Sequence, residues 1–115
     1  MLFIEYPKCS TCRKALKYLE DSNKNVTARN IVEETPTKEE LISWMDKSGL
    51  EPKKFFNTSG KVYKELGLKD KAGLMSKEEI AEMLSGNGML IKRPILVTDD
   101  KVIIGFKEEE YSNLE

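Results

Sequence analysis

Residues 2–16 of the chain, LFIEYPKCSTCRKAL, decide which fold the sequence favours. The apolar run Leu2–Tyr6 is typical of a short buried strand, and Pro7 ends it because proline lacks the N–H that a strand ladder needs. An apolar stripe at positions i, i+3, i+4 and i+7 predicts a helix from about Ser10 to Asp21; its members are Cys12, Ala15, Leu16 and Leu19. Val26–Ile31 is predicted to be a second strand. A strand, a helix and a strand joined by short links form a βαβ unit with parallel strands.

Residues 36–90 are expected to be mostly helical. The less regular stretch from 55 to 68 predicts short helices around a turn. A Ser or Thr followed three residues later by Glu is the spacing of a capping box, which begins a helix. The spacing occurs twice in this region, as Thr37 with Glu40 and as Ser76 with Glu79.

A hairpin and a last helix follow the helical region. Ile95–Thr98 and Lys101–Ile104 are β-rich runs, and the Asp99-Asp100 pair between them predicts a turn that joins two antiparallel strands. A short helix is expected over residues 107–114. The order of elements predicts an α/β fold with a central mixed sheet, formed as a single domain of residues 1–115.

The composition excludes several classes of function. A chain of 115 residues is long enough for one ordinary domain. Nineteen basic and twenty acidic residues leave a net charge of −1, so no strong field attracts nucleic acid. No run approaches the roughly 20 apolar residues that span a bilayer, and the N-terminus does not have the pattern of a secretory signal. The absence of histidine excludes Cys–His and Ser–His–Asp catalysis and every His-ligated metal site.

The only two cysteines, Cys9 and Cys12, form one Cys-x-x-Cys unit at the predicted junction of strand and helix. Because there is no further cysteine to pair with, we expect a cytoplasmic protein rather than a secreted disulfide framework. Unpaired N–H groups at a helix start, with Lys8 and Arg13 on either side, favour a thiolate at Cys9. Cys12 belongs to the apolar stripe and is expected to be shielded. This asymmetry predicts that Cys9 attacks a disulfide or an oxidised substrate and that Cys12 resolves the mixed disulfide.

Two other interpretations of the cysteine pair stay open. A Cys-x-x-Cys unit can be half of a zinc site, but four ligands are needed. The chain has no third cysteine and no histidine, so zinc would require carboxylate ligands or a second chain. Cys12 is also consistent with a purely structural role, because a free cysteine packs as a small apolar side chain.

Arg93-Pro94 is a second candidate feature, directly before the first strand of the hairpin. Most X–Pro bonds are trans, and proline is tolerated at the first position of a strand. A single arginine is most often a solvated charge. The residues alone therefore do not distinguish Arg93 from an ordinary surface arginine.

Four segments spread over nearly the whole chain resemble corresponding segments of one known family. They are YPKCSTCRKA at residues 6–15, FNTSG at 56–60, YKELGL at 63–68 and LIKRPI at 90–95. The family is that of the arsenate reductases, in the glutaredoxin-like branch that also contains the Spx-type transcription regulators. The resemblance implies a thioredoxin-like fold with a helical insertion over about residues 36–90.

The resemblance also implies roles for individual residues. Cys9 falls on the nucleophilic cysteine of the family. The arsenate reductases carry a single cysteine at this site, whereas the Spx-type regulators share the Cys-x-x-Cys unit that includes Cys12. Arg93 falls on an oxyanion-binding arginine, which would hold an anion or stabilise the Cys9 thiolate. Pro94 falls on a cis-proline that faces the active-site cysteine. The backbone N–H groups of the first helical turn would complete an anion nest, and the residues concerned are Ser10, Thr11 and Arg13.

The sequence departs from the family at the substrate clamp. The arsenate reductases carry arginine where Asn57 and Phe106 stand here, so the resemblance favours a thiol–disulfide reductase over an enzyme that acts on arsenate itself. The implied electron donor is glutathione, glutaredoxin or thioredoxin, with no bound cofactor or metal. The alternative is an Spx-type redox-sensing regulator whose partner is the RNA polymerase α subunit. Neither interpretation involves a membrane or direct contact with nucleic acid.

Overall fold

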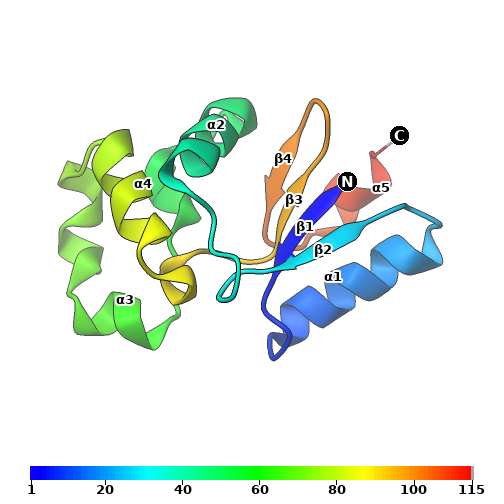
Figure 1. Ribbon diagram of the computed structural model, residues 1–115, viewed down its shortest axis with the longest axis horizontal. Helices are drawn as coiled ribbons and strands as arrows, with labels where there is room; N and C mark the ends of the chain where they lie inside the picture. Colours follow the sequence, from blue (N-terminus) through cyan, green and yellow to red (C-terminus); the bar gives the residue numbers. More distant parts are fainter. Residues whose placement is uncertain (115) are drawn as a thin grey trace.

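A four-stranded mixed sheet lies between two helical layers in the computed structural model, which describes residues 1–114 (Figure 1). Strand β1 (Leu2–Glu5) occupies an inner position, parallel to β2 (Thr27–Asn30) and antiparallel to β3 (Ile95–Val97). Strand β4 (Val102–Ile104) pairs antiparallel with β3, so the order across the sheet is β2-β1-β3-β4. The predicted mixed sheet is confirmed.

Helices α1 (Ser10–Asp21) and α5 (Glu108–Ser112) cover one face of the sheet. Successive side chains on a strand point to opposite faces, so one set of strand residues meets these helices. Phe3, Leu96 and Ile103 are aligned in the sheet register and are buried against them. Their helical partners are Ala15, Leu19 and Tyr111. The helix predicted from Ser10 to Asp21 is confirmed at both ends.

The opposite face of the sheet packs against the helical region between β2 and β3. This region contains α2 (Lys38–Ser48), α3 (Lys61–Glu65) and α4 (Lys77–Ser85), with single turns of 3₁₀ helix at Pro52–Phe55, Leu68–Asp70, Ala72–Leu74 and Gly88–Leu90. Ile4 and Ile95 join its core from the sheet. Within residues 1–114, no helix is long and apolar enough to cross a membrane.

Both predicted capping boxes are present and begin α2 and α4. The Thr37 hydroxyl accepts from the Glu40 amide at 3.1 Å, and the Glu40 carboxylate accepts from the Thr37 amide at 3.0 Å. Ser76 and Glu79 make the same two bonds at 3.1 and 2.9 Å. Each box satisfies two amides that a helix start would otherwise leave unpaired, which is why these helices begin where the sequence predicts.

Strand β2 is shorter than the predicted span of Val26–Ile31. The side-chain oxygen of Asn30 accepts from the amides of Val32 and Glu33 at 2.8 and 3.0 Å, which turns the chain out of the strand. A local side-chain bond therefore ends the strand at Asn30 although the apolar pattern continues to Ile31.

The hairpin strands are each one residue shorter than predicted, because the turn includes Thr98 and Lys101. The Thr98 hydroxyl accepts from the Lys101 amide at 2.9 Å and holds the four-residue connection closed. Helix α5 covers Glu108–Ser112, inside the predicted span of 107–114.

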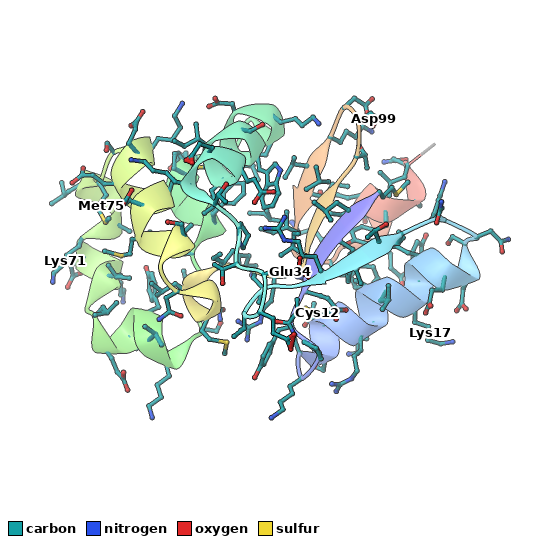
Figure 2. All side chains as sticks on the ribbon, in the orientation of Figure 1. Cys12, Lys17, Glu34, Lys71, Met75 and Asp99 are labelled. Atoms are coloured by element: carbon teal, nitrogen blue, oxygen red, sulfur yellow. The ribbon has the colours of Figure 1, made fainter. Side chains whose placement is uncertain are left out.

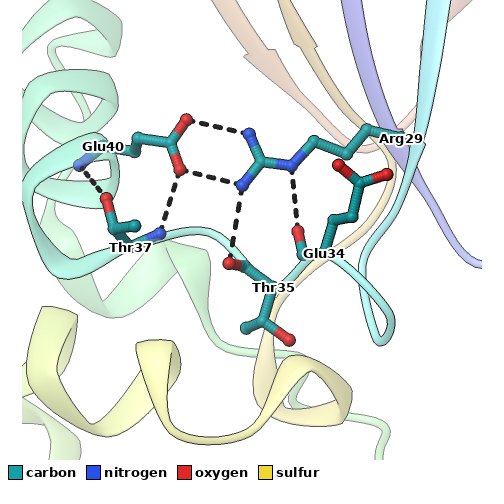
Figure 3. A network of polar contacts seen from close by, with 5 residues as sticks. All are labelled: Arg29, Glu34, Thr35, Thr37 and Glu40. Atoms are coloured by element: carbon teal, nitrogen blue, oxygen red, sulfur yellow. Dashed lines mark hydrogen bonds and ion pairs between the residues drawn. The ribbon is translucent and has the colours of Figure 1, made fainter.

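An ion pair ties the sheet to the helical region (Figure 3). The Arg29 guanidinium on β2 donates to both carboxylate oxygens of Glu40 on α2, each at 2.8 Å. Its Nε also donates to the carbonyl oxygen of Glu34 at 2.9 Å. The bond from Arg29 is the largest influence on the pKa of Glu40, which is lowered to about 2 although partial burial opposes the shift. Because the guanidinium bonds both carboxylate oxygens, the contact fixes the orientation of α2 relative to β2 and also stabilises the fold.

We predict that Glu40→Gln lowers the free energy of unfolding at neutral pH by about 1 kcal/mol, since the pair is partly exposed. Glutamine preserves the capping box, so the change isolates the charge. Folding lowers the pKa of Glu40, so its contribution is present above an unfolded pKa of about 4.3 and disappears as the pH falls toward about 2. Urea denaturation of both proteins across this range measures the difference.

Glu39→Gln is the matched control, because it removes the same charge from the same helical turn. Equal destabilisation by the two changes, or a difference that persists unchanged at the lowest pH, would contradict the assignment.

Candidate functional site

Cys9 lies where the loop after β1 enters α1. Its amide donates to the Tyr6 carbonyl oxygen at 2.9 Å, and its backbone is extended, which makes it the N-cap residue of α1. The Cys9 sulfur accepts from the Cys12 amide at 3.4 Å. The thiol therefore occupies the position of a capping oxygen, facing the positive end of the helix dipole, and the residue is half-buried.

Cys12 lies one turn into α1, at the end of the helix nearest to the helical region, whereas Lys17 lies farther along (Figure 2). Its side chain has no solvent exposure. Burial is the main reason that the pKa of Cys12 is raised to about 12, and the neighbouring Cys9 raises it further. Both cysteines are free thiols. The predicted contrast between an accessible and a shielded sulfur is present in the structure.

The pKa of Cys9 shifts in the opposite direction. Partial burial alone would raise it, but hydrogen bonding from the Cys12 thiol and amide and the positive guanidinium of Arg93 outweigh burial and lower it from the ordinary value. A lowered pKa increases the thiolate fraction at neutral pH, and the thiolate is the reactive form of cysteine.

Arg93 reaches this site from the start of β3, directly before Pro94. The Arg93–Pro94 peptide bond is cis. The guanidinium carbon of Arg93 lies 5.1 Å from the centre of the Tyr6 ring, a cation–π contact. Its Nη1 atom is buried and has no hydrogen-bond partner among residues 1–114. An unpartnered buried donor beside a thiolate is suited to an anionic ligand.

A large open groove of about 1300 Å³ runs past the site. Cys9, Thr11 and Arg93 line it together with Asn57 and Phe106. The structure therefore brings four segments that are distant in sequence to one surface.

Two residues predicted for the anion site do not line this groove. The Arg13 amide donates to the Cys9 carbonyl oxygen at 3.1 Å, and the Arg13 guanidinium donates to the Pro7 carbonyl oxygen at 3.0 Å. The guanidinium of Arg13 thus stabilises the loop before Cys9. Because the Arg13 amide makes a helical hydrogen bond, it is not available to bind an anion. Ser10 is exposed and lies outside the groove lining.

Other residues of the site were missed by sequence reasoning. Tyr6 holds the Arg93 guanidinium, and although it begins the YPKCSTCRKA segment, nothing in that segment assigns a role to its ring. Lys54 and Lys92 line the groove, but separate lysines in a chain so rich in charge carry no local signal. Among residues 1–114, no cluster of three or more Cys, Asp or Glu side chains is arranged to hold a metal ion.

Comparisons with known proteins identify the family of the chain. The family model for the ArsC family matches residues 4–114. The chain belongs to the ArsC family. The "uncharacterized protein YusI" of Bacillus subtilis is 51% identical over 111 residues, which cover 96% of this chain and 94% of YusI. The regulatory protein MgsR of the same organism is 32% identical over 116 residues, covering 99% of this chain and 89% of MgsR.

Solved structures of ArsC proteins also match. The crystal structure of a putative ArsC family related protein from Bacteroides fragilis has a TM-score of 0.95 and 53% sequence identity. The match covers 99% of this chain and 96% of that one. The predicted family and the predicted thioredoxin-like fold with a helical insertion are both confirmed.

We predict that iodoacetamide at neutral pH modifies Cys9 faster than Cys12 in the reduced protein. The midpoint of the pH–rate profile of Cys9 is expected below the ordinary thiol value of about 8.5. Arg93→Ala removes a nearby positive charge, so it should raise this midpoint and slow modification at neutral pH by up to about tenfold. Mass spectrometry of peptides after timed quenching measures both rates.

Lys14→Ala is the matched control, because Lys14 is an exposed cation on α1 that makes no ion pair within residues 1–114. Equal modification of the two cysteines, or an Arg93→Ala variant indistinguishable from Lys14→Ala, would contradict the site.

Proposed function

We propose that this ArsC-family chain is a thiol–disulfide oxidoreductase in which Cys9 is the nucleophile, Cys12 the resolving thiol and Arg93 the group that orients anionic substrate and stabilises the thiolate. The observation that carries the proposal is the pairing of a half-buried Cys9, whose pKa is lowered, with a fully buried Cys12 whose amide contacts its sulfur. Thr11 lies at the start of α1 and lines the groove, so its backbone N–H adds a hydrogen-bond donor to the same site.

The reaction takes place in two steps. The Cys9 thiolate attacks one sulfur of a substrate disulfide, forms a mixed disulfide and releases the other sulfur as a thiolate. Cys12 then loses its proton and attacks the Cys9 sulfur, which forms the Cys9–Cys12 disulfide and releases the second substrate thiolate. The substrate gains two electrons, and the cysteine pair loses two.

The electrostatics of Cys12 favour this order of steps. Burial is the main cause of the raised pKa of Cys12, and the Cys9 thiolate raises the pKa further by its charge and hydrogen bonding. Formation of the mixed disulfide removes the charge of Cys9, whereas burial and the nearby positive charge of Arg93 remain. The pKa of Cys12 therefore falls once Cys9 has reacted, which makes Cys12 a better nucleophile for the second step.

A thiol carrier must return the two electrons. Glutathione, glutaredoxin or thioredoxin supplies them by thiol–disulfide exchange, and a reducing compartment such as the cytoplasm provides these carriers. Exchange of this kind requires access to the Cys9 sulfur, which the open groove supplies.

Disulfides are favoured over arsenate as substrates. Asn57 and Phe106 line the groove where the family's arsenate reductases carry arginines, so Arg93 acts without those two partners. Amide and phenyl groups do not reproduce the two-point contact of a guanidinium with an oxyanion. The remaining site is better matched to a sulfur-centred exchange than to an oxyanion clamp.

Trapping tests the proposal directly. Cys12→Ser should accumulate a mixed disulfide through Cys9, because the second step is lost while the first remains. Cys9→Ser should abolish both reduction of 2-hydroxyethyl disulfide and trapping. Trapped proteins are identified from cell extract by non-reducing electrophoresis and mass spectrometry.

The double variant with serine at both positions is the control for non-covalent capture. Failure of Cys12→Ser to form any mixed disulfide with an added disulfide would contradict the proposed mechanism.

A second candidate function rests on the similarity to MgsR, which its name describes as a regulatory protein. In this alternative the Cys9–Cys12 disulfide acts as a redox sensor, and the protein binds the RNA polymerase α subunit. Capture by the C-terminal domain of that subunit, compared under oxidising and reducing conditions, separates the two functions. Oxidation-dependent capture supports the regulator, and no capture in either condition contradicts it.

A further inference from the structure

The groove beside Cys9 concentrates a positive charge that the chain as a whole lacks. The full sequence has one more acidic than basic residue. The groove, however, is lined by only two carboxylates, Asp70 and Glu110, against six cationic side chains: Lys53, Lys54, Lys69, Lys92, Arg93 and Lys107. A surface cleft lined by one sign of charge focuses the field and attracts ligands of the opposite sign.

Much of this charge is not neutralised within the protein. Lys54, Lys69 and Lys92 form no ion pair with any carboxylate of residues 1–114. Lys53 pairs at 3.3 Å with the exposed Glu51, which lies outside the groove lining, and Lys107 pairs at 4.0 Å with Glu110. The groove therefore presents three lysines, Lys54, Lys69 and Lys92, that are not paired with a carboxylate of residues 1–114.

The size and rim of the groove indicate a ligand larger than a small molecule. Its volume of about 1300 Å³ exceeds the range of about 300–1,000 Å³ typical of small-molecule pockets. Two leucines on its lining are exposed, Leu50 by 42% and Leu74 by 88%. A surface that combines lysines with exposed leucines suits a polypeptide, which offers both carboxylates and apolar side chains.

The edge of the sheet at β4 also borders the groove, although Val102 and Ile103 are each only 6% exposed. Strand β4 is an edge strand of the sheet (Figure 1), and its residues line the groove. The Gly105 amide donates to the Pro94 carbonyl at 2.8 Å, which joins the end of this edge to the Arg93 site. Antiparallel alternation then directs the backbone groups of Val102 and Ile104 away from β3. Such an edge can pair with an extended polypeptide segment.

We propose that the groove binds an extended acidic segment of a protein substrate, which carries an oxidised cysteine to Cys9. This inference rests on the proposed function and names its substrate class. The exchange is the one already described: the Cys9 sulfur bonds to the substrate sulfur, the substrate disulfide breaks, and Cys12 completes the two-electron reduction. Carboxylates of the segment meet the lysines of the groove while its backbone follows the edge of β4.

Model disulfides test the inference against its alternatives. Three peptides of about ten residues, roughly 33 Å when extended, carry a central cysteine joined to 2-mercaptoethanol and flanking residues that are acidic, neutral or basic. Two small probes accompany them: 2-hydroxyethyl disulfide, which is neutral, and oxidised glutathione, which is small and acidic. The full-length reduced protein is mixed with each, and the rate of Cys9–Cys12 disulfide formation is measured by acid quenching and mass spectrometry.

We expect the acidic peptide to react at least about tenfold faster than the basic peptide at low salt, and faster than oxidised glutathione. The preference should decrease at about 1 M salt, where the Debye length is about 3 Å. Lys54→Glu combined with Lys69→Glu should lower the acidic-to-basic rate ratio by about tenfold or more.

Lys14→Glu combined with Lys64→Glu is the matched control. Both lysines are exposed and outside the groove lining, and the change in net charge is the same. The control should leave the rate ratio within about twofold of the original value. A control that lowers the ratio as much as the groove variant would overturn the inference, because the effect would then come from net charge alone.

The outcomes separate the two proposals. No reaction with 2-hydroxyethyl disulfide or with any peptide would contradict the oxidoreductase itself. Reaction with all disulfides at rates independent of peptide charge would overturn only the acidic substrate. Oxidised glutathione reacting as fast as the acidic peptide would overturn the polypeptide and leave a small acidic disulfide as the substrate.

Discussion

The hydrogen bond from the Cys12 amide to the Cys9 sulfur both caps the start of α1 and helps to lower the pKa of the Cys9 thiol. A helix start requires an acceptor for its unpaired amides, and here a sulfur provides it at 3.4 Å instead of the usual oxygen. The same contact places the thiol at the positive end of α1 and helps to lower its pKa. It also fixes Cys12 one turn further along, on the buried face of the helix. One local bond thus sets the different environments of two sulfurs in the same short motif.

The tertiary structure completes this arrangement from the other end of the chain. Pairing of β3 with β1 places the segment before β3 near the start of α1, which brings the charge of Arg93 to bear on Cys9. Tyr6, on the loop that leads to Cys9, faces the Arg93 guanidinium and holds it without a hydrogen bond to Nη1. The same residues that carry the backbone from strand to helix therefore position the cation. A change in this loop would affect the charge environment of the thiol as well as the helix start.

The helical region and the sheet contribute different residues to the site. The sheet and α1 supply the sulfur pair, whereas the helical region supplies three of the six cationic side chains of the groove, Lys53, Lys54 and Lys69. The Arg29–Glu40 pair holds the two together, with its guanidinium bonded to the carboxylate at two points.

The sequence by itself determined the elements whose causes are local. The stripe that includes Cys12 and Leu19 predicted α1, and the two capping boxes predicted the starts of α2 and α4, because these signals act over a few helical turns. It also determined the contrast between Cys9 and Cys12, since burial follows from the side of the helix. The family resemblance of the LIKRPI segment implied that Arg93 acts on Cys9, and the structure places its charge there. Only the tertiary structure decided that Arg13 turns away to Pro7 and that scattered lysines share a groove. These facts depend on strand pairing and on packing between distant segments, for which no local pattern of residues carries a signal.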